Sequence, residues 1–419
     1  MQPLNVLVWG TAEQGACAYF RGHLFDEPLR ELGVNLRHIS KVDFKPAPGW
    51  EDKPPQEVFA AGKMTLDTSD LDWADVIMFR RYYNTSFKCA ADRDDLAVCK
   101  FRTLDPDEAR AHPHGAREQD GITRTLWPVV RDYFTGGIVY ETDDDHWKIK
   151  PWNGYYGDVL LERDLVGDMA RRADLVTVST PVLARSYGRY NPRIRVIRNA
   201  VDPDLYTQVS ERTDQRTRLV YYGSTARMRD YAGYHDERGR FRGGYARAAV
   251  DDAHKRYGLH RVFLGTNPGT EHIIRKAFDE QTPYIENIPE FSRALANAHG
   301  DIGIAPLGGD DFDHAKSELH WLEYALTGMA FVGERYSGTH GPYNVIRNGV
   351  DGLLARGSQE WFDSIRKLTL SQDLREQLAG AAKERVLAEY DYRVRAAEWA
   401  DAFRWAAEHA GIGHKEKAA

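Results

Sequence analysis

The stretch from residue 301 to residue 354 decides the fold of this chain: DIGIAPLGGDDFDHAKSELHWLEYALTGMAFVGERYSGTHGPYNVIRNGVDGLL. A short apolar strand ends at residues 305–307, and an aspartate-rich loop, 308–313, follows it. The spacing of apolar residues then predicts a helix that begins near Ala315 and ends at Gly328. A buried strand that leads through a loop into a helix is typical of a parallel sheet covered by helices.

The same alternation runs outward from this stretch in two series. The first series of predicted strands is 4–9, 34–39, 76–79, 138–140, 175–178 and 194–197, with a helix over 19–32. The second series is 219–222, 262–264, 302–305 and 331–332. Two such series predict an α/β protein with two Rossmann-like domains that face a cleft.

The polar stretch 208–217 indicates a domain boundary near residues 200–215. We expect a first domain over 1–205 and a second domain over 206–390. A terminal helix within 391–419 would dock back on the first domain. Residues 84–124 are polar and indicate a long excursion from the first domain.

Composition limits the class of protein. The chain has 419 residues and a net charge of −7, which argues against a surface coated in basic residues for nucleic acid. No stretch approaches the roughly 18 apolar residues of a membrane span, and the first residues lack a signal-peptide pattern. The three cysteines show no zinc spacing and favour a reducing compartment. We therefore expect a cytoplasmic protein with no cofactor, no metal ligands and no membrane span.

The order and spacing of motifs over residues 135–400 resemble the GT-B glycosyltransferases, in the retaining group often called family 4 or group 1. The resemblance rests on the APL tripeptide, the KSxLxxLEYxxxG segment and the Asn348-Gly349-x-Asp351-Gly352 turn. Residues 1–135 share it only in outline. It implies a GT-B fold and the transfer of a sugar from a nucleotide-sugar donor to a hydroxyl acceptor, with retention and without a metal.

The resemblance also implies which residues hold the donor. A leaving diphosphate needs cations or helix N-termini, and Lys316 stands where the family usually has Glu, so we interpret it as a phosphate clamp. Glu323 would accept hydrogen bonds from the ribose diol, on the same helix face as Lys316. The alternative is a solvated helix face. The expected donor-side residues are Gly223, Ser224, Arg227, Arg229, Ile288, Lys316, Ser317 and Glu323.

A second candidate site is the run ETDDDHW over residues 141–147, at the carboxyl end of a predicted parallel strand, where ligands bind in α/β sheets. One of Asp144, Asp145 or His146 would orient the acceptor, and these three and Lys316 are the catalytic candidates. The DxD pattern within it matches the metal site of the GT-A class. We interpret that match as accidental, because a GT-A domain lacks the second strand series. The alternative is an acidic turn that caps a helix.

Two further segments complete the candidate site. The first loop would line the cleft near the acceptor, and the expected acceptor-side residues are Gly10, Gly15, Arg21 and Trp147. The alternative for this loop is an ordinary turn. The Arg-rich segment 227–247 could bind pyrophosphate, close over the donor or bind a polyanionic acceptor. The alternative interpretation of this segment is a solvated loop.

Two alternative functions stay open at this point. The Arg-rich segment keeps open a DNA-base glycosyltransferase of the phage type, whose acceptor is a nucleic acid. Lys316, in place of the usual Glu, keeps open a non-catalytic GT-B binding or scaffold protein.

Overall fold

The computed structural model describes residues 2–415 apart from short gaps. The gaps are 11–14, 40–43, 55–56, 59–60, 62–63, 81–85, 90–100, 104–116, 119–120, 152–155, 213, 224–226, 236–238, 240, 267–275 and 338–340. Within the described residues, none of the helices combines the length and apolar composition that crossing a membrane requires.

The N-terminal half of the chain builds a parallel sheet with the strand order β12-β11-β10-β5-β1-β2. Every residue of β5 and β10, at its centre, is buried, as expected for strands covered on both faces. The strands are β1 (Leu4–Trp9), β2 (Val34–Ile39), β5 (Val76–Arg80), β10 (Gly137–Thr142), β11 (Leu175–Val178) and β12 (Ile194–Val196). The helices between them include α1 (Ala16–Arg21), α2 (Asp26–Glu31), α4 (Ser69–Trp73), α6 (Leu126–Tyr133), α7 (Tyr156–Arg172) and α8 (Pro181–Tyr187).

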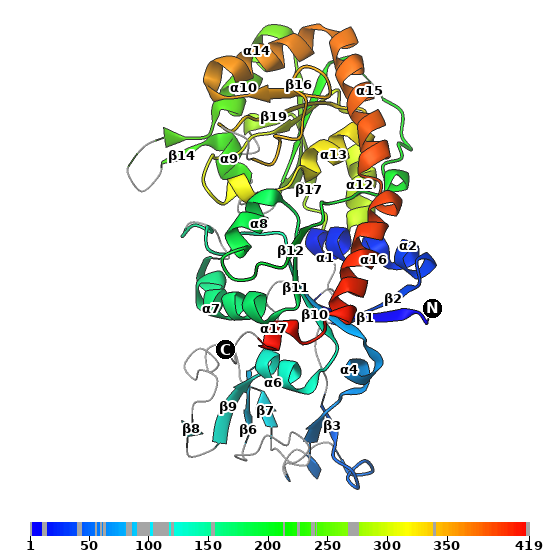
Figure 1. The fold of residues 1–419 in the computed structure, drawn as a ribbon. Coiled ribbons are helices and arrows are strands. Elements are labelled where there is room, and N and C mark those ends of the chain that lie inside the picture. The colour runs from blue at the N-terminus through cyan, green and yellow to red at the C-terminus, as the bar shows by residue number, and fades with distance from the viewer. Residues whose placement is uncertain are drawn as a thin grey trace.

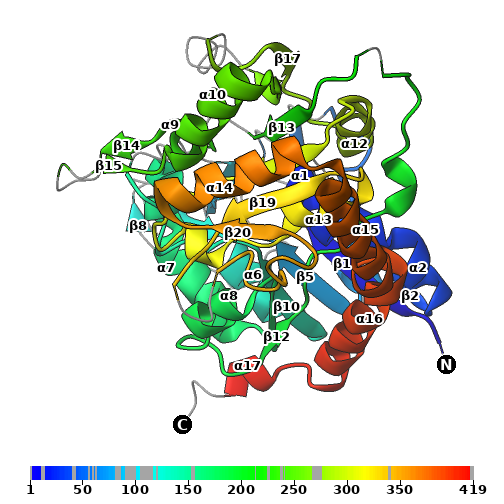
Figure 2. The same ribbon diagram turned by 90° about the horizontal axis from the view of Figure 1, so that it is seen from above.

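The C-terminal half builds a second parallel sheet with the order β17-β16-β13-β18-β19-β20. Its strands are β13 (Arg218–Tyr222), β16 (His260–Thr266), β17 (Glu280–Pro283), β18 (Ile302–Ala305), β19 (Ala330–Glu334) and β20 (Leu353–Ala355). Its helices are α9 (Met228–Ala232), α10 (Tyr245–Tyr257), α12 (Ile288–Asn297), α13 (Leu319–Leu326), α14 (Gly357–Leu370) and α15 (Gln372–Glu389). Figure 1 shows the two sheets in separate lobes, and Figure 2 shows α14 and α15 lying across the second sheet.

This architecture confirms the predicted α/β fold with two parallel-sheet domains. Strands β17 and β20 were not predicted, because β17 has the polar sequence EQTP and β20 has three residues. Short antiparallel strands also fall outside the prediction: β3 (Phe44–Pro46), β4 (Met64–Leu66), β6 (Ser86–Cys89), β7 (Phe101–Thr103), β8 (Arg117–Glu118) and β9 (Gly121–Thr125). Strands β6 to β9 form one sheet at the end of the first domain that lies away from the second (Figure 1).

The helix predicted over 19–32 is wrong in detail, since the chain there forms α1, the 3-10 turn η1 (His23–Phe25) and α2. Gly22 leaves the helical region at φ −144°. Pro28 has no N–H to continue a helix from the preceding turn, but it fits the first turn of a new one. The bend between α1 and α2 therefore follows from two residues.

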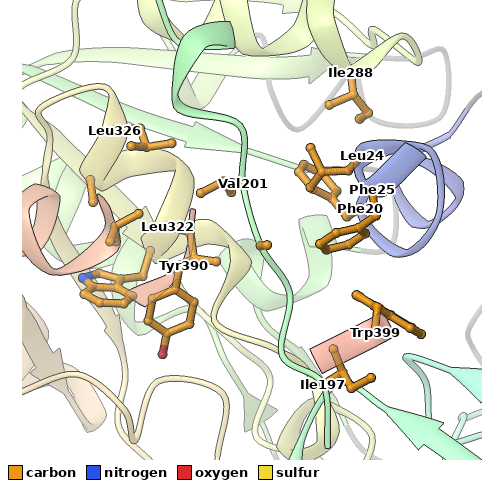
Figure 3. Close-up of a cluster of buried hydrophobic side chains, with 14 of the residues drawn as sticks. Phe20, Leu24, Phe25, Ile197, Val201, Ile288, Leu322, Leu326, Tyr390 and Trp399 are labelled. Carbon is orange, nitrogen blue, oxygen red and sulfur yellow. The ribbon is translucent and has the colours of Figure 1, made fainter. Parts of the chain in front are cut away.

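The last long helix, α16 (Tyr392–Glu408), returns to the first domain, where it packs against β10, α2 and η1 before α17 (Ile412–Lys415). The chain first crosses between the domains at Val201, whose N–H donates to the carbonyl of Tyr390 at 3.0 Å. Figure 3 shows the buried cluster around this crossing, with Val201 and Tyr390 between Leu322 of α13 and Trp399 of α16. The segment after the crossing contains the 3-10 turn η3 (Pro203–Leu205).

The contact between α16 and β10 is tested by Gly137→Ala. A Cβ atom at residue 137 would lie 2.4 Å from the carbonyl oxygen of Ala406 in α16. We expect the substitution to lower the free energy of unfolding by about 1–3 kcal/mol, the usual cost of overpacking, in urea denaturation.

The matched control is Gly157→Ala in α7, where an added Cβ would have no neighbour within 4 Å. Alanine at this position should leave stability unchanged or raise it. Equal unfolding midpoints for the Gly137 variant and the wild type would contradict the docking of α16 on β10.

Candidate functional site

The carboxyl ends of the two sheets meet where the segment after β18, residues 310–318, contacts the first domain. The ammonium of Lys316 lies 2.5 Å from Oδ1 of Asp144, which follows β10. Lys148 and Asp311 form a second pair, at 3.4 Å, that is more exposed. The structure therefore joins the two sequence-derived candidate regions, 141–147 and 301–354, through an ion pair between domains.

Further polar contacts hold this segment on the loops after β11 and β12. They are Thr180 Oγ1 to the carbonyl of Ala315 at 3.1 Å, Asn199 Nδ2 to Ser317 Oγ at 2.8 Å, and Arg198 Nη1 to Glu318 Oε1 at 2.9 Å. Thr180 also caps α8, accepting from the N–H of Leu183. The sequence analysis gave Thr180, Arg198 and Glu318 no role in the site, because only their partners across the interface distinguish them from ordinary cap and surface residues.

The predicted helix start near Ala315 is wrong. The carboxylate of Asp310 accepts from the N–H groups of Phe312 and Asp313 at 2.9 Å each, and this supports the 3-10 turn η5 (Asp313–Ala315). Lys316 then adopts an extended conformation, and α13 begins three residues later. Lys316 and Glu323 therefore do not share a helix face, and Lys316 is free to point across the interface.

Glu323 points into the core instead. It is 2% exposed, and its two oxygens accept from the hydroxyls of Tyr206, at 3.0 Å, and Tyr222. Burial raises its pKa to about 7, although both tyrosine hydrogen bonds act in the opposite direction. The expected contact between this carboxylate and a ribose therefore has no support in the geometry, because the tyrosines occupy the positions that ribose hydroxyls would need.

The guanidinium of Arg227 lies next to two aspartate carboxylates. Its Nη1 is 3.1 Å from Asp230 Oδ2 and 3.5 Å from Asp313 Oδ1. The N–H of Gly308 donates to Asp230 Oδ1 at 2.9 Å, and a Cβ at this glycine would meet the same oxygen at 2.9 Å. Burial raises the pKa of Asp230 to about 6 and that of Asp313 well above its ordinary value. Arg227 is thus held by carboxylates at the position where we expected it to face pyrophosphate.

The remaining donor-side candidates are spread over several environments. Gly223 follows β13 and lies so close to Arg227 that an added Cβ would be 2.7 Å from the Cβ of that arginine. The guanidinium of Arg229 lies over the ring of Tyr234, 5.2 Å from its centroid. Ile288 belongs to the buried cluster of Figure 3, which points it at the core. Ser224 lies outside the described residues.

Of the three candidates after β10, Asp144 pairs with Lys316 of the second domain. Asp145 is buried and accepts from the hydroxyl of Ser186 in α8, while burial raises its pKa. His146 Nδ1 lies 2.7 Å from the hydroxyl of Tyr187, also in α8. These contacts hold Asp145 and His146 against α8, whereas the carboxylate of Asp144 lies at the interface.

The acceptor-side candidate Arg21 is 1% exposed. Its Nε donates to Glu141 Oε1 at 2.8 Å, and its Nη1 donates to the carbonyl of Ile197 at 2.6 Å. Arg80 donates to the other oxygen of Glu141 at 2.9 Å. The geometry thus gives Arg21 the role of a buried crosslink between α1, the sheet and the chain that leaves β12.

The other acceptor-side candidates lie near the ends of β1 and β10. Trp147 stacks on Tyr190 with ring centroids 4.5 Å apart, so one of its faces is already covered. The N–H of Gly10 donates to Ile39 at 2.8 Å, and Gly15 precedes α1. The loop between these glycines, 11–14, lies outside the described residues.

A cavity of about 730 Å³ lies elsewhere in the first domain, at the amino ends of its strands. Leu4, Asp75, Gly136 and Ala407 are among its lining residues. Ligands of open parallel sheets bind at the carboxyl ends, so we place the candidate site at the domain interface rather than in this cavity.

Comparisons with known proteins show a sequence match over part of the chain and a similar fold over nearly all of it. Residues 247–401 match the family described as "Glycosyl transferase-like". Anabaena HepE in complex with UDP and glucose superposes with a TM-score of 0.55 at 11% identity, over 95% of this chain and 98% of that chain. A glycosyltransferase from Rickettsia africae gives 0.56 at 10%, over 97% and 99%, and TarM gives 0.55 at 9%, over 96% and 98%. No curated protein matches the chain.

The buried Glu323 predicts a specific pH dependence. Because its pKa rises from 4.5 to about 7 on folding, its contribution to stability is complete below pH 4.5 and is lost as pH rises through 7. Glu323→Gln does not titrate. The unfolding free energy of the wild type relative to this variant should therefore fall by about 2.5 kcal/mol between pH 5 and pH 8, at about 1.4 kcal/mol per pKa unit.

Urea denaturation at a series of pH values measures this difference. Glu384→Gln, at an exposed position on α15, is the control for the exchange of a carboxylate for an amide. A difference between wild type and Glu323→Gln that stays constant with pH would show that Glu323 is not the buried titrating group.

Proposed function

We infer that the chain, a GT-B glycosyltransferase by its family match and its fold, transfers a sugar from a nucleotide-sugar donor to an acceptor hydroxyl. The observation that carries this inference is the contact of Lys316 with Asp144, where the carboxyl ends of two parallel sheets meet. HepE is described in complex with UDP-glucose, so a UDP-sugar is the first donor that we propose for this chain.

Lys316 is the cation that we assign to the leaving diphosphate. Its side chain is 23% exposed and pairs with the carboxylate of Asp144, whereas Arg227 lies between Asp230 and Asp313. A diphosphate carries more charge than one carboxylate, and its charge grows as the bond to the sugar breaks. Donor binding would therefore draw Lys316 from Asp144 and release that carboxylate toward the acceptor.

We propose that transfer retains the anomeric configuration and needs no metal. In this scheme the bond between the sugar C1 and the phosphate oxygen breaks, the acceptor oxygen bonds to C1 on the same face, and the acceptor proton passes to the phosphate oxygen. The engagement of Asp145 and His146 by α8 supports a scheme that needs no strong protein base. The three cysteines support the proposal of a cytoplasmic enzyme.

Two alternatives lose support from the same contacts. A DNA acceptor would use the Arg-rich segment, but Arg227 is held by two carboxylates and Arg229 lies over Tyr234. A non-catalytic scaffold was suggested by Lys316, but in the structure this residue lies at the interface beside Asp144 rather than in solvent.

A thermal-shift screen with UDP-, GDP-, TDP- and ADP-sugars tests the proposed donor class. A bound donor at 100 times its dissociation constant should stabilise the protein by about 2.7 kcal/mol, and we expect this effect from a UDP-sugar. With an accepted donor, the anomer of the product measured by NMR tests retention, and an unchanged rate in EDTA tests metal independence. A screen without any shift would rule out the proposed function.

Lys316→Ala tests the clamp. Removing one preorganised group that stabilises a developing anion typically lowers kcat by about 100-fold or more, and we expect a loss of that order. Affinity for the free nucleoside should change much less, because the diphosphate is the partner of Lys316. Steady-state kinetics and calorimetry with the nucleoside measure the two effects separately.

Two further variants make this test decisive. Lys148→Ala removes the other lysine of the interface, whose pair with Asp311 is more exposed, and should leave kcat nearly unchanged. Lys316→Glu restores the usual family residue but places a negative charge beside Asp144, so it should stay inactive. An active Lys316→Glu enzyme would rule out the clamp.

A further inference from the structure

Three side chains from three elements converge beside the edge strand β2. His23 begins η1, Asp26 begins α2, and His38 lies near the end of β2. His38 Nε2 is 2.7 Å from Asp26 Oδ1, and His23 Nδ1 is 3.7 Å from Asp26 Oδ2. The two imidazole rings are 4.0 Å apart between centroids. The cluster thus joins the bent helical segment to the following strand and is held together by the fold.

The chemistry of these atoms suits one class of ion. One ligand atom from each residue lies within 4.8 Å of the other two, and within the described residues no other group of histidine, cysteine or acidic side chains meets this condition. Two imidazole nitrogens and one carboxylate oxygen favour borderline transition metals such as Zn²⁺ over Mg²⁺ or Ca²⁺, which prefer oxygen ligands. Three protein ligands leave a fourth tetrahedral position for water.

We propose that His23, Asp26 and His38 form a binding site for a divalent transition-metal ion of the Zn²⁺ class. The ion can enter, because the side chains of His23 and Asp26 are each 36% exposed and that of His38 is 12% exposed. The ligand atoms need a small adjustment, since the 2.7 Å between His38 and Asp26 is shorter than the separation of about 3.4 Å that metal bonds of about 2.1 Å give in a tetrahedron.

The site would tie the edge of the first sheet to the bent helical segment that covers it. Val34, Leu36 and His38 share one face of β2 because side chains alternate along a strand, and Val34 and Leu36 pack in the same cluster as Phe25. The metal would add a fixed link at the polar end of this apolar face. It would also fix η1, which begins two residues after the crosslinking residue Arg21.

A second cluster in the chain shows what separates a metal site from an ordinary ion-pair network. His254 and His260 lie 3.6 Å and 3.9 Å from the carboxylate of Asp279. Arg261, however, donates to both oxygens of that carboxylate, at 2.9 Å and 3.2 Å. A guanidinium bound in this way occupies the carboxylate lone pairs that a metal ion would need. Its positive charge also repels the metal ion. A substitution of His254 is therefore the matched control for substitutions of His23 and His38.

Metal binding to the purified, EDTA-treated chain tests the site. Zn²⁺ should raise the melting temperature, while Mg²⁺ at the same concentration should not. Co²⁺ should give the visible absorption bands of a tetrahedral site that contains nitrogen ligands. No shift with Zn²⁺, or an equal shift with Mg²⁺, would overturn the proposal.

Three variants locate the ion. His23→Asn and His38→Gln place an amide near the ligating nitrogen, so each can still hydrogen-bond to Asp26 and keep the fold. Each should weaken Zn²⁺ binding on the order of 100-fold in calorimetry, since even residues that only orient ligands cost 10–100-fold. His254→Asn should bind Zn²⁺ as the wild type does. Unchanged affinity in the first two variants, or a loss confined to the third, would overturn the site.

Discussion

The rest of the structure depends on a buried carboxylate shared by two arginines. Glu141 at the centre of the first sheet is fully buried, and it accepts from Arg21 of α1 and from Arg80 at the end of β5. A buried charge is tolerated only when it is paired and hydrogen-bonded. Arg21 meets this need by also donating to the carbonyl of Ile197 and by lying 4.9 Å over the ring of Trp399. One network thus joins α1, the sheet, the chain crossing between domains and α16.

This network also fixes the site at the domain interface. Ile197 and Asn199 both accept from Nη1 of Arg21, and Asn199 in turn donates to Ser317 of the second domain. The segment that carries Lys316 is therefore aligned by the same buried arginine that orients the strands. The acceptor-side role expected for Arg21 follows from its position in the sequence, close to the first loop. Its burial shows that it acts on the interface through the backbone around Ile197.

Most of the fold could be predicted because it depends on patterns within single segments. Fully buried strands such as β5 and β18 appear in the sequence as short apolar runs, and the resemblance over 135–400 depends on the order of such runs. Strand β17 could not be found in this way, because it is polar and its pairing with β16 alone defines it. The metal-ligand cluster was missed for a related reason. Its residues are spaced 3 and 12 positions apart, and only the return of β2 beside η1 brings His38 to His23.

The site shows where reasoning from spacing along the chain fails. Placing Lys316 and Glu323 on one helix face assumed that the helix spans both, but the carboxylate of Asp310 supports a 3-10 turn just before Lys316. After that turn, an extended residue directs the lysine toward Asp144, while the following helix directs Glu323 toward the tyrosines of the core. A motif thus identifies the residue types but not their surroundings. A carboxylate next to two tyrosine hydroxyls and a lysine next to a carboxylate of the other domain have different chemistry, although the same sequence pattern contains both.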